Sequence, residues 1–247
     1  MAKTKNTTNS VSVKPIIFSA EMVRALLDGR KTQTRRVMKV QPDHYIRELQ
    51  VGKYHPTKIG KDGMEYPGDE IFGAFCDWGE FGLKAPYIPG DLLWVKETWR
   101  GIVKINAPWE PHEEGVARYT PNRASCAGIE YKASHVSNDE PWRASIHMPR
   151  WASRLTMRVT NVRAERLQDI SEDDARAEGV RKEGIRGHAL WSGRDTERPT
   201  LPSARQAFLD HIWTDLYGEH ETKSVGANPW VWVYDFEVIR KNVDEVA

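Results

Sequence analysis

Cysteine, long apolar runs and an excess of charge of either sign are all missing or scarce in this chain. Two cysteines among 247 residues, Cys76 and Cys126, cannot build a disulfide framework or a four-thiolate zinc site. No His-x-x-x-His or Cys-x-x-Cys pair is present, and no stretch of about 18 uncharged apolar residues occurs. The first ten residues lack the apolar run of a signal peptide. The sequence therefore predicts a cytoplasmic protein with no metal, no cofactor and no membrane contact.

Charge is balanced overall but concentrated locally. Lys and Arg number 36 and Asp and Glu number 35, so no bulk charge draws the protein to nucleic acid. One group of cations is opposed locally by Asp28 alone: Arg24, Arg30, Lys31, Arg35, Arg36 and Lys39. This group predicts either a phosphate site or a solvated face. Flanking cations are expected to lower the pKa of Lys31, which would let its amine act as a base.

Apolar periodicity predicts strands joined by a few helices. The expected strands are 15–18, 30–37, 92–99, 155–162 and 230–238, and 116–119 pairs with 129–132 in a possible hairpin. Helices are expected after Ser19, after Ser171 and over 204–217, the first two ending near Gly29 and Gly179. Because strand and helix do not alternate regularly, we expect an α+β barrel rather than a doubly wound sheet.

The corner at Lys31 resembles a known family. Gly29-x-Lys31-x-x-Thr34-x-Arg36 is similar to the Gly-x-Lys-x-x-Glu-x-Arg motif of the ASCH domain (activating signal cointegrator homology), which implies a small PUA-like β-barrel with flanking helices. Thr34 stands where many members have Glu, and Gly-Arg-Lys-Thr-x-Thr-x-Arg resembles bacterial ASCH enzymes that hydrolyse N4-acetylcytidine. In those enzymes the Lys and the second Thr act with a Glu on the helix after the third strand. The matching helix here places that residue at Glu178.

Longer runs resemble members of the same family from tailed phages and prophages. These runs are 89–99, 145–154 and 228–233. The segments that resemble the family are 14–38, 89–104, 144–181 and 205–240, less than half of the chain. We therefore predict a flexible arm at 1–13, one domain at 14–240 and a tail at 241–247. Insertions at 39–88, 105–143 and 182–204 are expected to govern the choice of substrate or partner.

The three matched residues have a plausible division of labour. The Thr34 hydroxyl could attack an amide carbonyl or position a water, Lys31 could accept its proton, and Glu178 could deliver a proton to the leaving amine. Because Lys31 and Thr34 are an odd number of residues apart, a regular strand would point them to opposite faces. They converge only if 29–32 is still a turn or a bulge.

Other residues are candidates for contacting substrate or RNA. Arg30, Arg35 and Arg36 belong to the cationic corner, and the run at 145–154 adds His147, Arg150, Trp151 and Arg154. The cations could contact a phosphate and Trp151 could stack on a base. Equally, the run could be a short helix that packs Trp151 into the core. Trp94, Trp230 and Trp232 are expected in the core rather than on a base platform.

Several functions fit these observations. The resemblance favours a hydrolase of a modified nucleoside, most specifically an amidohydrolase of N4-acetylcytidine or a related N4-acylated cytidine. The alternatives are a module that binds RNA or a modified base without chemistry, a ribonuclease, and a phage counter-defence protein that binds a host protein. The acyl group, the choice between free nucleoside and polymer, and the oligomeric state are left open by the sequence.

Overall fold

The computed structural model describes residues 11–77, 79, 81–107, 109–135, 141–185, 188–193 and 200–246. The chain forms two compact units, each assembled from separate segments. Unit 1 comprises Met1–Ala20, Gly90–Arg158 and Val238–Ala247, and unit 2 comprises Glu21–Pro89 and Val159–Glu237. Most of the arm predicted at 1–13 lies outside the described residues. No helix in the described ranges is long and apolar enough to cross a membrane.

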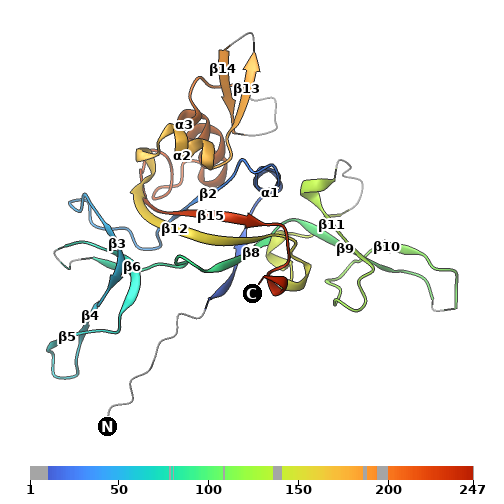
Figure 1. Ribbon diagram of the computed structural model, residues 1–247, viewed down its shortest axis with the longest axis horizontal. Coiled ribbons are helices and arrows are strands. Elements are labelled where there is room, and N and C mark those ends of the chain that lie inside the picture. The colour runs from blue at the N-terminus through green and yellow to red at the C-terminus, as the bar shows by residue number, and fades with distance from the viewer. Residues whose placement is uncertain are drawn as a thin grey trace. The chain divides into compact units, whose positions relative to one another are not determined.

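Unit 1 contains strands of a five-stranded sheet and the whole of a three-stranded sheet (Figure 1). Strand β1 (Val13–Ile17) pairs in parallel with β8 (Leu92–Lys96), which pairs antiparallel with the start of β12 (Thr156–Arg166). In the other sheet β9 (Trp99–Lys104) is central, flanked by the antiparallel strands β10 (Glu114–Val116) and β11 (Gly128–Tyr131). Single 3-10 turns follow at Lys132–Ser134, Ser145–His147, Arg150–Ala152 and Val243–Glu245. Trp99 is fully buried against Met148 and Ala152.

Unit 2 continues β12 into a sheet of order β12-β15-β2. Strands β15 (Trp230–Ile239) and β2 (Gln33–Val37) are antiparallel, with Asp235 opposite Gln33. The helices are α1 (Ala20–Leu27), α2 (Glu172–Ala177), α3 (Ala204–Ala207) and α4 (Thr214–Tyr217), with a 3-10 turn at Leu167–Asp169 and a π-helical segment at Phe208–Trp213. Apolar side chains of these elements form one core cluster with Val231 and Val233 of β15: Leu167, Ile170, Phe208 and Trp213.

Residues 39–88 contain strands where their Gly and Pro content predicted little regular structure. Strands β3 (Gln50–Tyr54), β6 (Ile71–Phe75) and β7 (Gly82–Lys84) form one sheet, and β4 (Thr57–Ile59) pairs with β5 (Glu65–Pro67). Every residue of β4 and β5 is exposed, so neither strand needs the alternation of apolar and polar residues that marks a half-buried strand.

Three other local predictions are corrected by the structure. Strands β10 and β11 pair with opposite edges of β9, so the predicted hairpin of 116–119 with 129–132 is wrong. The loop predicted at 182–204 contains the hairpin of β13 (Arg181–Ile185) and β14 (His188–Ser192). The helix at 204–217 is π-helical in its middle, which places both Phe208 and Trp213 in the core. Local patterns find such elements but not their partners.

The main elements and the fold class agree with the sequence. The chain is mostly strand with few helices, so the α+β class is confirmed. Ser171 accepts a hydrogen bond from the Asp174 N–H as the predicted cap of α2. Trp230 and Trp232 are 3% and 1% exposed and therefore belong to the core, as expected, whereas Trp94 is only half-buried. Among the described residues, the strand pairings leave β1 and β2 as edges and do not close a barrel.

The Glu172 carboxylate should stabilise the start of α3. Its Oε2 accepts from the Ala204 N–H at 2.9 Å and its Oε1 from the Arg205 N–H at 3.3 Å. Glu172→Ala leaves these helix-start donors without an acceptor, so we expect a loss of about 1 kcal/mol in the free energy of unfolding. Urea unfolding measures it. Asp173→Ala is the control, because the Asp173 side chain is 90% exposed on the same helix. Equal losses in both variants would contradict the capping role.

Candidate active site

Lys31 lies at the corner between α1 and β2. Gly29 has φ = 74°, a left-handed conformation that favours glycine, and the N–H groups of Arg30 and Lys31 both donate to Ala25 O at 3.0 Å. Lys31 then forms an isolated antiparallel bridge with Glu178 before β2 begins. Lys31 therefore lies outside the regular strand. Because Lys31 and Thr34 are an odd number of residues apart, only such a position would let their side chains converge.

Glu178 lies at the C-terminal end of α2, immediately before a glycine that permits close packing. Gly179 has φ = 99°, and a Cβ built there would be 3.0 Å from the Cβ of Ala25 in α1. The N–H of Thr32 donates to Ala177 O at 2.8 Å. The end of α2 is thus joined by backbone contacts to the corner that carries Lys31.

The side chains of Lys31 and Glu178 form a buried ion pair. Lys31 Nζ lies 2.6 Å from Glu178 Oε2 and also donates to the Glu178 carbonyl oxygen at 3.0 Å. The two side chains are only 1% and 3% exposed. Arg35 Nη1 lies 3.4 Å from Glu178 Oε1, so a second cation faces the same carboxylate. The structure therefore brings two of the three matched residues into direct contact.

Burial lowers the pKa of Lys31 below its usual value of 10.5. The attraction and the hydrogen bond of Glu178 oppose this shift, while Arg36 and Arg35 lower the pKa further. The direction agrees with the prediction from the sequence, but the main cause is loss of solvation rather than the flanking cations. A lysine in this setting loses its proton more readily than one in water.

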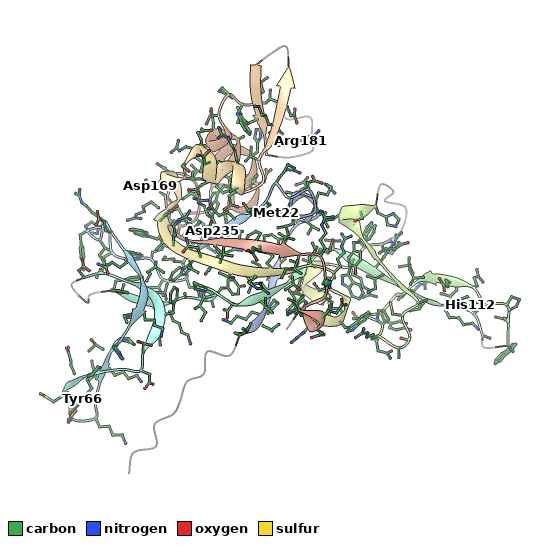
Figure 2. The ribbon with its side chains drawn as sticks, viewed as in Figure 1. Met22, Tyr66, His112, Asp169, Arg181 and Asp235 are labelled. Atoms are coloured by element: carbon green, nitrogen blue, oxygen red, sulfur yellow. The ribbon has the colours of Figure 1, made fainter. Side chains whose placement is uncertain are left out.

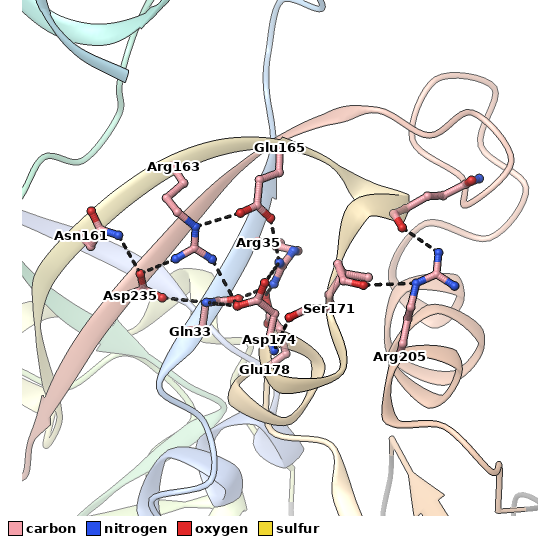
Figure 3. A network of polar contacts seen from close by, with 12 residues as sticks. Gln33, Arg35, Asn161, Arg163, Glu165, Ser171, Asp174, Glu178, Arg205 and Asp235 are labelled. Carbon is pink, nitrogen blue, oxygen red and sulfur yellow. Dashed lines mark hydrogen bonds and ion pairs between the residues drawn. The ribbon is translucent and has the colours of Figure 1, made fainter. Parts of the chain in front are cut away.

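Arg35 is the centre of a polar network (Figure 3). Its Nη2 lies 3.0 Å from Glu165 Oε2 and 3.2 Å from Asp174 Oδ2, and its Nη1 also donates to Gln33 Oε1. Its Nε is buried and has no acceptor among the described residues. The Arg35 side chain is 0% exposed, so neither the predicted substrate contact nor the solvated face describes it. Its geometry instead holds Glu178 beside Lys31.

A second guanidinium, on β12, extends the network. Arg163 lies 2.8 Å from Glu165, 3.2 Å from Asp174 and 2.7 Å from Asp235, measured between nitrogen and carboxylate oxygen. Asp235 projects from the central strand β15 (Figure 2) and also accepts from Gln33 Nε2 at 2.7 Å. Strands β2, β12 and β15 and helix α2 are therefore tied by alternating cations and carboxylates.

The Thr34 hydroxyl is placed differently from the other two matched residues. Thr34 is 3% exposed. In β2 it lies between Gln33 and Arg35, whose side chains both point into the network, so strand alternation directs Thr34 to the opposite face. Its hydroxyl is not bonded to Lys31 or Glu178 in this structure.

The remaining cations of the corner have separate contacts. Arg30 donates to the Gly179 carbonyl oxygen at 2.6 Å and pairs with Asp28 at 2.9 Å. Arg36 is half-buried on β2, opposite Trp232 of β15. Arg30 therefore also fastens the end of α2, and it is partly accessible because its side chain is 30% exposed.

The predicted binding residues at 147–154 belong to unit 1 and are mostly engaged in local contacts. Arg154 makes a two-point contact with Glu97 at 2.8 and 2.9 Å and covers the ring of Tyr131. Trp151 packs edge-on against Trp99. These contacts fit the core-packing alternative for this run.

Two residues of the same run remain exposed. Arg150 pairs with Asp244 at 2.5 Å, and His147 ends a 3-10 turn on the surface. Trp151 and Arg154 also line a polar groove of about 330 Å³ together with Arg123, Arg240 and Lys241. Asp244 and Glu245 line this groove as well, so its charge is mixed. A contact with RNA through this run stays a prediction.

The sequence analysis missed most of the network, although two signals for it exist. Asp174 and Glu178 are four residues apart at the end of α2, a spacing that places both on one helix face. Asn161, Arg163 and Glu165 alternate along β12 and therefore share one side of that strand. Neither signal shows that the two rows meet at Arg35.

Comparisons of the chain with protein-family models, with curated proteins and with solved structures found no match. Among the residues that the structure describes, no group of three or more His, Cys, Asp or Glu side chains could hold a metal ion. The candidate site is accordingly defined by its own geometry. Lys31 and Glu178 are buried in contact, and Arg35 joins Glu178 to the carboxylates of Glu165 and Asp174.

Close packing at Gly179 should be necessary for the Lys31–Glu178 contact. Gly179→Ala imposes a strained φ and brings a Cβ within 3.2 Å of the Lys31 Cβ, so we expect a loss of about 2–4 kcal/mol in the free energy of unfolding. Gly29→Ala is the control at the same corner, because φ is positive but nothing lies within 4 Å, and it should cost about 1 kcal/mol. Equal losses in urea unfolding would contradict the packing argument.

Asp174 should make the stability of the protein sensitive to acid. Burial would raise its pKa, but the hydrogen bond from Gln33 and the charges of Arg35 and Arg163 outweigh it and lower the pKa below 3.8. The unfolded chain therefore binds more protons near pH 4, and stability falls as pH drops through the folded-state pKa. Asp174→Asn should flatten this acid-side slope in unfolding measured from pH 6 to 2. An unchanged slope would show that the contacts do not persist in solution.

Proposed function

We propose that this protein is an ASCH-type amidohydrolase that removes the acyl group from N4-acylated cytidine, with N4-acetylcytidine as the reference substrate. The single observation that carries the proposal is the 2.6 Å contact between Lys31 and Glu178. These residues are 147 positions apart, and the resemblance to the N4-acetylcytidine amidohydrolases pairs the same two positions. Strands β2, β8, β12 and β15 lie in segments that resemble the family and would supply its PUA-like barrel.

The Lys31–Glu178 pair is suited to moving one proton through an amide hydrolysis. A water oxygen adds to the acyl carbon and gives its proton to the neutral amine of Lys31. Glu178, in its protonated form, gives a proton to N4 as the C–N bond breaks, which yields cytidine and the carboxylic acid. Transfer of a proton from Lys31 Nζ to Glu178 Oε2, which lie 2.6 Å apart, then returns the lysine to its neutral form and the glutamate to its protonated form. The lowered pKa of Lys31 makes its neutral form accessible below pH 10.5.

Thr34 is assigned to the attacking side of the reaction. Its hydroxyl is assigned to orienting the attacking water. Arg35 acts as a positioning residue, because it contacts Glu178 and not the exterior.

Activity should depend on both members of the buried pair. We expect wild-type protein to convert N4-acetylcytidine to cytidine, followed by chromatography, and Lys31→Met or Glu178→Gln to lower kcat by about 10²-fold or more. Lys39→Ala, an exposed cation of the same segment, is the matched control and should keep full activity. Absence of turnover by the wild type would refute the function, whereas full turnover by both variants would refute the residue assignment.

Stability must be separated from chemistry, because each single variant leaves one charge buried and unpaired. Either change should cost about 3–5 kcal/mol of unfolding free energy. The double variant Lys31→Met/Glu178→Gln removes both charges and should recover much of that loss while remaining inactive. Thr34→Ser should retain activity and Thr34→Val should lose it. A stable, active double variant would contradict the mechanism.

The alternative functions give different products in the same assay. With a short RNA that contains N4-acetylcytidine, amide hydrolysis changes a base and leaves the strand intact, whereas a ribonuclease shortens the strand. A binding module shifts the RNA in a native gel without changing either. A counter-defence protein would leave the RNA alone and form a stoichiometric complex with a host protein.

A further inference from the structure

The sheet β10-β9-β11 of unit 1 borders a groove of about 1110 Å³. Small-molecule sites in proteins typically measure roughly 300–1,000 Å³, so this groove could hold a ligand of substantial size. The residues that line it come from the end of β9, from 115–119 and from 141–143. All of these segments lie in unit 1, and the groove is therefore separate in composition from the Lys31 site.

Among the described residues that line the groove, every charged side chain is a cation. These are Lys104, Arg118 and Arg143. Lys104 and Arg118 are exposed, and neither has an ion-pair partner among the described residues. Glu114 lies opposite Lys104 in the strand register, but its carboxylate bonds to His112. In a chain with a net charge of only +1, the described lining of this groove concentrates positive charge.

Two donors of the lining residues lack acceptors. Trp142 Nε1 and Arg143 Nε are buried and have no hydrogen-bond partner among the described residues. Indole and guanidinium nitrogens are donors only, as is the ammonium group of Lys104. Buried donors without partners are costly, and a ligand rich in acceptors would satisfy them. The polar chemistry of the groove therefore calls for an anionic ligand with several oxygen or nitrogen acceptors.

The apolar part of the lining calls for an aromatic ring. Tyr119 lines the groove and is 58% exposed, and Ile105 beside it is 55% exposed. One face of the Trp142 ring is already covered by the Arg100 guanidinium at 4.4 Å, which leaves Tyr119 as the exposed ring of the groove. Aromatic side chains of this kind stack on nucleic-acid bases, while neighbouring cations contact the phosphates.

We propose that this groove binds a nucleotide, with the base stacked on Tyr119, its acceptors facing Trp142 and Arg143, and its phosphate between Lys104 and Arg118. The nucleotide is either free or one unit of a single-stranded nucleic acid, since both present the same base and phosphate. The site combines the end of β9 with residues of the segment 105–143, and the family resemblance offers no counterpart for that segment. Binding here does not depend on the hydrolysis proposed for the Lys31 site.

Calorimetric titration of the full chain tests the proposal with four probes: uridine 5′-monophosphate, uridine, inorganic phosphate and a five-nucleotide single-stranded RNA. We expect saturable binding of the monophosphate, weaker binding of uridine and of phosphate, and affinity that falls as salt increases. A much tighter pentanucleotide identifies single-stranded nucleic acid as the source, and equal affinities identify the free nucleotide. No binding of either nucleotide probe at millimolar concentration, or equal affinity for phosphate alone, would overturn the proposal.

Variants assign the contacts without removing core residues. Arg118→Ala and Lys104→Ala should each weaken binding about three- to tenfold and reduce its salt dependence, and Tyr119→Ala should weaken it about tenfold or more. Trp142→Phe keeps an aromatic ring at this position but deletes the N–H donor, so it should also weaken binding. Tyr45→Ala and Lys61→Ala are controls, because both residues are exposed in unit 2. Equal effects from the controls would overturn the site.

Discussion

The buried contact between Lys31 and Glu178 is the interaction on which the site and much of unit 2 depend. Removing two charges from water costs several kcal/mol for each ion, and a short contact between them repays this only with further hydrogen bonds. Here the Glu178 carboxylate also faces Arg35, and the Lys31 amine also donates to the Glu178 carbonyl oxygen. Backbone bonds from Thr32 to Ala177 fix the same corner. The pair is therefore held by main chain as well as by charge.

The polar network shows how one unit can carry several buried charges. Arg35 faces Glu165, Asp174 and Glu178, and Arg163 shares the first two of these carboxylates and adds Asp235. Each carboxylate thus meets at least one cation, which compensates the loss of solvation. The network also links β2 and β15 with β12 and α2, which follow each other closely in the sequence. Positioning of the Lys31–Glu178 pair and cohesion of the unit consequently rest on the same side chains.

Much of the local structure could be predicted from the sequence, because it depends on neighbouring residues. The caps at Ser171 and Gly29 and the strands β2, β8, β12 and β15 follow from turn chemistry and apolar alternation. Strands β4 and β5 escaped prediction because all their residues are exposed. The pairing of β10 and β11 with β9 also escaped it, since hydrogen-bond partners across a sheet leave no mark on periodicity.

The sequence by itself singled out Lys31, Thr34 and Glu178 as candidate site residues, since Lys31 and Thr34 lie in one motif and Glu178 lies at the end of one predicted helix. The tertiary structure decided the rest: Lys31 and Glu178 are in contact, Thr34 lies on the other face of β2 from Arg35, and burial lowers the pKa of Lys31 more than the neighbouring cations do. It also decided that Arg35 is enclosed by carboxylates from β12 and α2. Burial and long-range pairing depend on how distant segments pack, and no local pattern contains that information.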